Sequence, residues 1–134
     1  MLELLSDINL CSRFDISDAT LASGAVQGTF VGWDGAAADT GVGYAIWTEN
    51  RGSEWSPDKG GTDQVTLLYG NYRAKSSECA DVDYTAGQPL YTAAGKLTNV
   101  NSGSDVVVGY AIGDEEDYKW LGATYARVLE FVTV

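Results

Sequence analysis

The stretch that decides the fold is residues 86–112, which read AGQPLYTAAGKLTNVNSGSDVVVGYAI. Short apolar segments alternate in it with turn residues, a pattern typical of β-strands joined by hairpins. We expect strands at 88–92 and 96–100, joined by a tight turn at 93–95. The segment 106–112 is apolar and mostly β-branched or aromatic, so we expect it to form a buried strand.

The composition of the whole chain favours a small all-β protein. Its 134 residues include 16 glycines, which indicates many turns, and 45% are hydrophobic, as in folded domains. A chain of this length forms one domain or two very small ones that share a core. We therefore predict an all-β fold, either a small β-barrel or a β-sandwich.

The net charge of the chain is −11, from 19 acidic and 8 basic residues. Such a chain repels phosphate backbones and anionic membranes, so we predict that it binds neither nucleic acid nor membranes. The excess of acidic residues either keeps the protein soluble or complements a basic surface on a partner. Because no apolar run approaches 18 residues and no secretory leader pattern is present, we expect a soluble protein that is not secreted.

One five-residue segment occurs twice in the chain. Residues Val42–Ile46 and Val108–Ile112 are both Val-Gly-Tyr-Ala-Ile, at an offset of 66. We interpret the repeat as two tandem, internally duplicated β units, although short β segments can also converge on the same letters. The predicted organisation is an N-terminal arm at 1–14, a first β unit at 15–70, a connector at 71–80 and a second β unit at 81–134.

Residues that could carry out catalysis or hold a metal ion are scarce. The chain has no histidine, which excludes His-based catalysis and Cys/His zinc sites. Cys11 and Cys79 have no imidazole to activate them, and they form one disulfide or remain buried thiols. The acidic run Asp114–Asp117 is expected in a solvated loop, with a catalytic pair or a calcium site as weaker interpretations. We predict no enzyme activity, no cofactor and no metal.

Several apolar and aromatic residues are candidates for contact with a partner. The N-terminal cluster forms either an edge strand or helical turn docked on the domain, or an arm that packs on a neighbouring subunit. A tryptophan in the long Gly/Pro-rich segment 49–62 and another after the acidic run are further candidates. The aromatic residues as a group form either a core or a sugar-binding face. The candidate contact residues are Leu2, Leu4, Leu5, Ile8, Trp55 and Trp120.

The second half of the chain resembles a family of small capsid decoration, or cement, proteins of tailed bacteriophages. Units of that family contain an Ala-Gly-x-Pro-Leu-Tyr strand, a Gly-Lys-Leu-Thr strand, a Val-Val-Gly-Tyr-Ala strand and a last strand with Arg-Val. The matching segments are Ala86–Tyr91, Gly95–Thr98, Val107–Ala111 and Arg127–Val128. The first half is similar in a looser form at residues 23–26, 41–46 and 64–70.

The resemblance implies a structural virion protein without an active site. Members of the family bind the outer surface of the expanded phage capsid and brace the shell against internal DNA pressure. The implied partner is the major capsid protein, with the chain as a homo-oligomer, a trimer or a dimer, on the capsid. The implied location is the outside of the virion, after synthesis in the bacterial host cytoplasm. The alternative function is a carbohydrate-binding β module of a phage tail, a fibre or a secreted enzyme.

Overall fold

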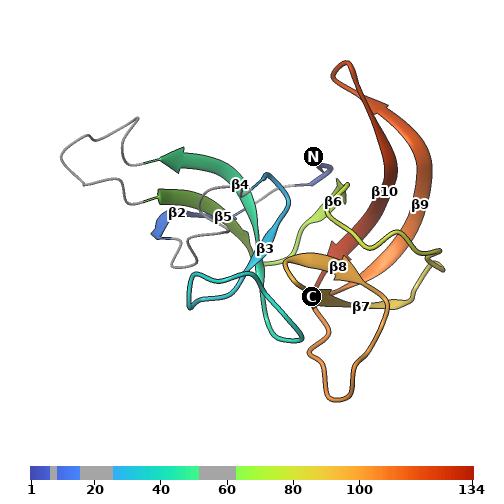
Figure 1. The fold of residues 1–134 in the computed structure, drawn as a ribbon, viewed down its shortest axis with the longest axis horizontal. Helices are drawn as coiled ribbons and strands as arrows, with labels where there is room; N and C mark the ends of the chain where they lie inside the picture. The colour runs from blue at the N-terminus through green and yellow to red at the C-terminus, as the bar shows by residue number, and fades with distance from the viewer. Residues whose placement is uncertain (7–8, 16–25, 52–62) are drawn as a thin grey trace.

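The computed structural model describes residues 1–6, 9–15, 26–51 and 63–134, and at 9–15, 48–51 and 63–64 it describes the backbone alone. All regular elements in these ranges are β-strands, so the prediction of an all-β protein is confirmed (Figure 1). Within the same ranges there is no helix long and apolar enough to cross a membrane.

The described strands form two antiparallel sheets. The six-stranded sheet has the order β1 (Leu2–Leu4), β6 (Arg73–Ser76), β10 (Ala123–Thr133), β9 (Gly109–Trp120), β7 (Pro89–Ala93) and β8 (Lys96–Thr98). The four-stranded sheet has the order β2 (Asn9–Asp15), β5 (Asp63–Tyr69), β4 (Tyr44–Arg51) and β3 (Phe30–Val31). The six-stranded sheet curls, so that the long β9–β10 hairpin rises away from the rest of the molecule (Figure 1).

The stretch 86–112 folds largely as its pattern predicts. β7 and β8 form a hairpin in which Ala93 pairs with Lys96 across a two-residue turn. Both turn residues, Ala94 and Gly95, have positive φ, as a type I′ turn requires. The third strand starts later than expected, at Gly109 rather than at residue 106.

One hydrophobic core lies between the two sheets. Phe131 on β10 is fully buried, and its ring lies 6.2 Å from that of Phe30 on β3 and 6.1 Å from that of Tyr72 (centroid distances). Two small sheets that each bury one face stabilise one another in this way. The other buried residues of this core are Leu2, Ala38, Ala45, Leu68, Ala74, Cys79, Tyr84, Leu90, Leu97, Val108, Ala111 and Leu129.

The two sheets share a topology. In each, four strands numbered along the chain take the order first, fourth, third, second: β2-β5-β4-β3 in one sheet and, with β8 left out of the numbering, β6-β10-β9-β7 in the other. The repeated Val-Gly-Tyr-Ala-Ile segment enters the third strand of each set, β4 and β9. The shared strand order is compatible with a duplication, which stays a prediction. The first strand of each set lies mostly or wholly in residues that the prediction assigned to the arm (β2) and to the connector (β6).

The acidic run Asp114–Asp117 lies within β9 and not in a loop, which corrects that part of the expectation, whereas Glu115, Glu116 and Asp117 are exposed to solvent as expected. β9 continues through these residues to Trp120 and turns back into β10 at Leu121 and Gly122. The run is compatible with a strand because basic side chains of neighbouring strands, Arg127 and Lys75, lie beside it.

The first residues of the chain are part of the sheet and not a free arm. β1 pairs with β6 in the register Leu2↔Ser76 and Leu4↔Ala74, and the Leu2 side chain is 0% exposed in the core. The alternative of an edge strand docked on the domain is therefore confirmed for this segment. Leu2 is unavailable to a partner because it is already buried within its own chain.

Replacing Leu2 by alanine should destabilise the protein. Truncating a fully buried leucine typically lowers the free energy of unfolding by about 3 kcal/mol, through lost burial and the cavity left behind. Leu5→Ala is the matched control, because Leu5 is 40% exposed and should change stability by less than about 0.5 kcal/mol. Urea titrations of both variants measure the difference. Equal unfolding midpoints would show that β1 is not docked in solution.

Candidate functional site

The structure separates the predicted contact residues from one another. Leu2 is in the core, Leu4 packs against the core, and Leu5 is exposed next to β1. Trp120 is half-buried at the far end of β9. Ile8 and Trp55 lie outside the described residues. Among the described candidates, Leu2 and Leu4 therefore contribute to the core, whereas Leu5 and Trp120 remain accessible at different places in the six-stranded sheet.

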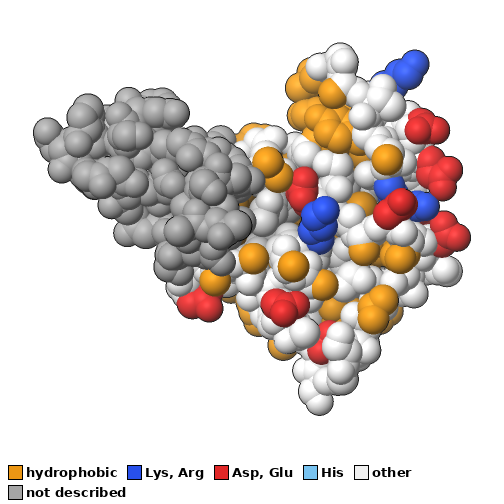
Figure 2. All heavy atoms as spheres, in the orientation of Figure 1, with side chains coloured by type: hydrophobic (Ala, Val, Ile, Leu, Met, Phe, Trp, Pro, Cys, Tyr) orange, Lys and Arg blue, Asp and Glu red, His pale blue; other side chains and the backbone are white. Residues whose placement is uncertain are grey.

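The β9–β10 hairpin is the most prominent feature of the described surface. Its strands pair from Gly109↔Thr133 to Trp120↔Ala123, with one irregularity in register between Glu130 and Phe131. In Figure 2, hydrophobic side chains gather at the upper end of this hairpin and acidic ones lie along its side. The hairpin thus combines an apolar end with a charged stem.

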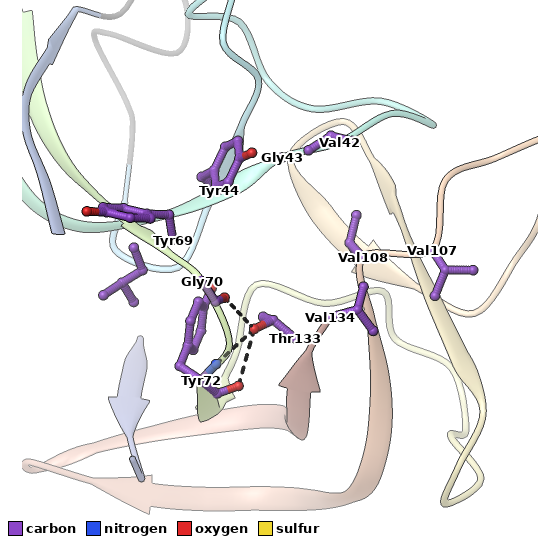
Figure 3. A pocket seen from close by; sticks show the side chains of 11 residues that line it. Val42, Gly43, Tyr44, Tyr69, Gly70, Tyr72, Val107, Val108, Thr133 and Val134 are labelled. Atoms are coloured by element: carbon purple, nitrogen blue, oxygen red, sulfur yellow. Dashed lines mark hydrogen bonds between the residues drawn. The ribbon is translucent and has the colours of Figure 1, made fainter. Parts of the chain in front are cut away.

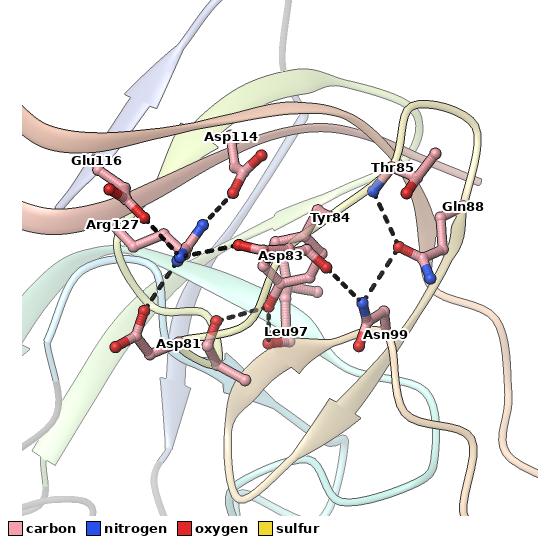
Figure 4. Close-up of polar contacts among 11 residues, drawn as sticks. Asp81, Asp83, Tyr84, Thr85, Gln88, Leu97, Asn99, Asp114, Glu116 and Arg127 are labelled. Carbon is pink, nitrogen blue, oxygen red and sulfur yellow. Dashed lines mark hydrogen bonds and ion pairs between the residues drawn. The ribbon is translucent and has the colours of Figure 1, made fainter.

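Arg127 organises the acidic stem of the hairpin (Figure 4). Its guanidinium donates hydrogen bonds to Asp114, to Asp81 at 2.9 Å and to Glu116 at 3.1 Å. A fourth carboxylate, that of Asp83, lies 3.4 Å away. The Arg127 side chain is mostly buried, whereas Asp81, Asp83 and Glu116 are exposed. One cation therefore joins β9 and β10 to the segment that follows β6.

The hydrogen bond to Asp81, with the charge of Asp114, raises the pKa of Arg127 above its ordinary value despite the desolvation of the guanidinium. A permanently charged arginine surrounded by carboxylates is an ion-pair network that holds strands together. Among the described residues, no group of three or more acids or cysteines is placed to hold a metal ion. The calcium interpretation of Asp114–Asp117 therefore has no support in this part of the chain.

A second set of contacts holds the other side of the stem. Lys75 on β6 pairs with Glu115 at 3.4 Å, and its ammonium lies 4.8 Å from the centre of the Tyr118 ring. The Tyr118 hydroxyl donates a hydrogen bond of 2.9 Å to Glu3 on β1. The projecting hairpin is thereby joined to β6, which pairs with β10, and to β1, the next strand of the same sheet.

Cys79 is a buried free thiol next to a shallow groove of about 630 Å³. Burial raises its pKa to about 11, so the reactive thiolate is scarce at neutral pH. The groove is also lined by Trp120, Tyr125 and Arg127 from the hairpin. Cys79 is therefore a core residue with little nucleophilic character, not a candidate catalyst.

A smaller pocket of about 250 Å³ lies where the two sheets meet (Figure 3). No charged side chain lines it, which is unusual for a chain with a net charge of −11. The Thr133 hydroxyl closes one side by donating to the carbonyl of Gly70 and accepting from the backbone N–H of Tyr72, both at 2.9 Å. The lining residues are Val42, Gly43, Tyr44, Leu68, Tyr69, Gly70, Tyr72, Val107, Val108, Thr133 and Val134.

Aromatic rings lie at and beside this pocket. Tyr44 and Tyr69 come from the paired strands β4 and β5, and the Tyr44 ring lies 4.6 Å from that of Trp33, which is 58% exposed. None of these three residues was singled out among the candidate contact residues, although the aromatic residues as a group were considered for a sugar-binding face. Tyr44 also belongs to the repeated segment, but neither signal distinguishes a site residue from a core residue.

Replacing Arg127 by glutamine should lower the melting temperature of the protein. The change leaves the carboxylate of Asp114, which is largely buried, without its partner. Arg73→Gln is the matched control: Arg73 is half-exposed and forms one ion pair, with Glu130, so its loss should have a much smaller effect. In the double variant Arg127→Gln/Asp114→Asn, part of the loss should be recovered. Thermal melts of the four proteins test this, and a double variant no more stable than Arg127→Gln would contradict the network.

Comparison with known proteins does not assign the chain to a family. No family model matches it, and no match was found among curated proteins or solved structures. The described residues show three surface features: the projecting β9–β10 hairpin, the Arg127 network on its stem, and a pocket between the sheets that no charged side chain lines.

Proposed function

We propose that the protein is a decoration protein of a tailed-bacteriophage capsid, which binds the outer surface of the expanded shell and stabilises it. The observation that carries the proposal is the placement of the segments that resemble this family. Four segments from different parts of the second half of the chain occupy neighbouring strands of a single sheet.

The segment Ala86–Tyr91 enters β7, and Gly95–Thr98 forms the following turn and β8. Val107–Ala111 enters β9, and Arg127–Val128 lies in β10. These strands are adjacent in the order β10-β9-β7-β8. The resemblance therefore covers a contiguous folded unit, which supports the proposal more strongly than scattered matching letters would.

A decoration protein acts through contact area and needs no reactive group. A stable contact with the shell should bury on the order of 1,000 Å² or more. Binding to the expanded shell alone then stabilises that shell by mass action. The acidic surface favours a partner with basic residues at the contact, and the proposal places the protein on the outside of the virion, with self-association there as a dimer or trimer.

The purified protein should co-sediment with shells assembled from the major capsid protein encoded in the same genome. We expect saturable binding at a ratio near one copy per capsid subunit, and a higher melting temperature of the decorated shells. Unexpanded shells are the matched control and should bind less. No co-sedimentation with expanded shells at micromolar concentration would contradict the proposal.

Carbohydrate binding is the second candidate function, and the uncharged pocket favours it. Neutral sugars are commonly held by aromatic rings together with hydroxyl and backbone hydrogen-bonding groups, without charged partners. Tyr44 and Tyr69 supply rings and hydroxyls at this pocket, and Trp33 lies beside Tyr44. The volume of about 250 Å³ is small for an organic ligand, so the site suits a single sugar unit.

A glycan array tests this second function. If the pocket binds a neutral sugar, the parent should bind on the array, and Tyr69→Ala should weaken that binding about tenfold or more, because a ring at the pocket is lost. Tyr110→Ala is the control, because Tyr110 is similarly exposed and does not line the pocket. Absence of array binding, or equal losses in the two variants, would exclude a sugar site here.

A further inference from the structure

We propose that the tip of the β9–β10 hairpin, residues 120–123, is an anchor that inserts into an apolar depression on the capsid subunit, bordered by basic side chains. This inference rests on the proposed function and identifies the part of the chain that makes the central contact. Three observations carry it: the backbone conformation of the tip, its exposure, and the bracing of the stem.

The tip has a residue poorly suited to its backbone conformation. Leu121 has a φ of +48° and Gly122 a φ of +80°, so both occupy the left-handed region that a type I′ turn requires. Asn, Asp and Gly are favoured at the first of these positions, because a side chain such as leucine meets steric repulsion there. Strain of this kind recurs at functional sites. Leu121 therefore disfavours the turn that it forms.

Burial within the chain does not compensate for this cost. The Leu121 side chain is 83% exposed, the largest fraction among the described large hydrophobic residues. The other turn of this kind in the described chain has the small residue Ala94 at the same position, with a φ of +49°. Trp120, beside the tip, lines the groove on the inner side of the hairpin. The tip thus has two consecutive apolar residues, the half-buried Trp120 and the exposed Leu121.

The stem holds the tip in a fixed place. Arg127 joins β9 and β10 to Asp81, and Lys75 and Glu3 hold Glu115 and Tyr118 on the other side. A rigid, preorganised element loses less conformational entropy on binding than a flexible loop does. Apolar side chains on such an element are the usual energetic centre of a protein interface, surrounded by polar contacts.

Charge identifies the partner. Glu115, Glu116 and Asp117 are exposed on β9 close to the tip. Lys119 is an exposed basic residue next to Trp120, and the chain has a net charge of −11. A tip-to-tip contact between two copies would bring the six acidic side chains together, and an anionic membrane would repel them. A protein surface with an apolar depression and a basic border matches both the tip and its stem.

The variant Leu121→Asn tests the anchor, because it changes stability and binding in opposite directions. Asn-Gly is the preferred pair for this turn, so the melting temperature should rise by about 3 °C. Affinity for expanded shells should fall about thirtyfold, the usual effect of losing a central apolar contact. Ala94→Asn makes the equivalent change at the β7–β8 turn. It should also raise the melting temperature, but it should leave shell binding unchanged.

Each outcome of the co-sedimentation assay decides between the proposals. If the parent and Ala94→Asn bind expanded shells and Leu121→Asn does not, the result supports the anchor. Equal binding of all three proteins overturns the anchor and leaves the capsid function in place. No binding by the parent overturns both. Sedimentation equilibrium measures self-association, and flotation with phosphatidylcholine vesicles measures membrane binding. If Leu121→Asn loses either of these and still binds shells, the tip contacts a different partner and the inference is overturned.

Discussion

The contact of Phe131 with Phe30 and Tyr72 is the interaction on which the rest of the structure depends. It joins the long strand β10 to the four-stranded sheet and to the segment between the two sheets, with ring centroids 6.2 and 6.1 Å apart. Neither sheet could remain folded with one apolar face in water, so the shared core is what allows 134 residues to form two sheets. The pocket between the sheets lies beside the same junction and is a consequence of it.

Two different interactions stabilise the two ends of β10. The end that contains Leu129 and Phe131 is fully buried and held by apolar packing. The other end extends beyond the core with β9, where little apolar surface is available, and ion pairs of Arg127 and Lys75 hold it instead. This division explains why the acidic residues concentrate on the stem. Leu121 at the tip is exposed and does not contribute to the core, and for this reason we assign the tip to a partner.

The candidate contact residues show what a sequence pattern can and cannot distinguish. Leu2 and Leu5 belong to the same apolar cluster, yet Leu2 is fully buried and Leu5 is exposed, because strand pairing with β6 decides which side chain faces the core. Trp120 was selected as an aromatic residue after an acidic run, and it does lie near the hairpin tip. Leu121 was not selected, because its positive φ and its exposure are properties of the turn and not of the letters.

The sequence by itself determined the all-β class and the β7–β8 hairpin, and it showed the repeated segment that enters β4 and β9. These features follow from local patterns: alternating apolar residues, a turn compatible with positive φ, and a repeated segment. Only the tertiary structure decided that residues 2–4 are a strand of the sheet, that Asp114–Asp117 belong to β9, and that Tyr44 and Tyr69 share a pocket with Val107 and Val134. The physical reason is that each of these depends on partners far away in the chain. Arg127 makes the acidic run compatible with a strand, and the packing of two sheets brings the pocket residues together.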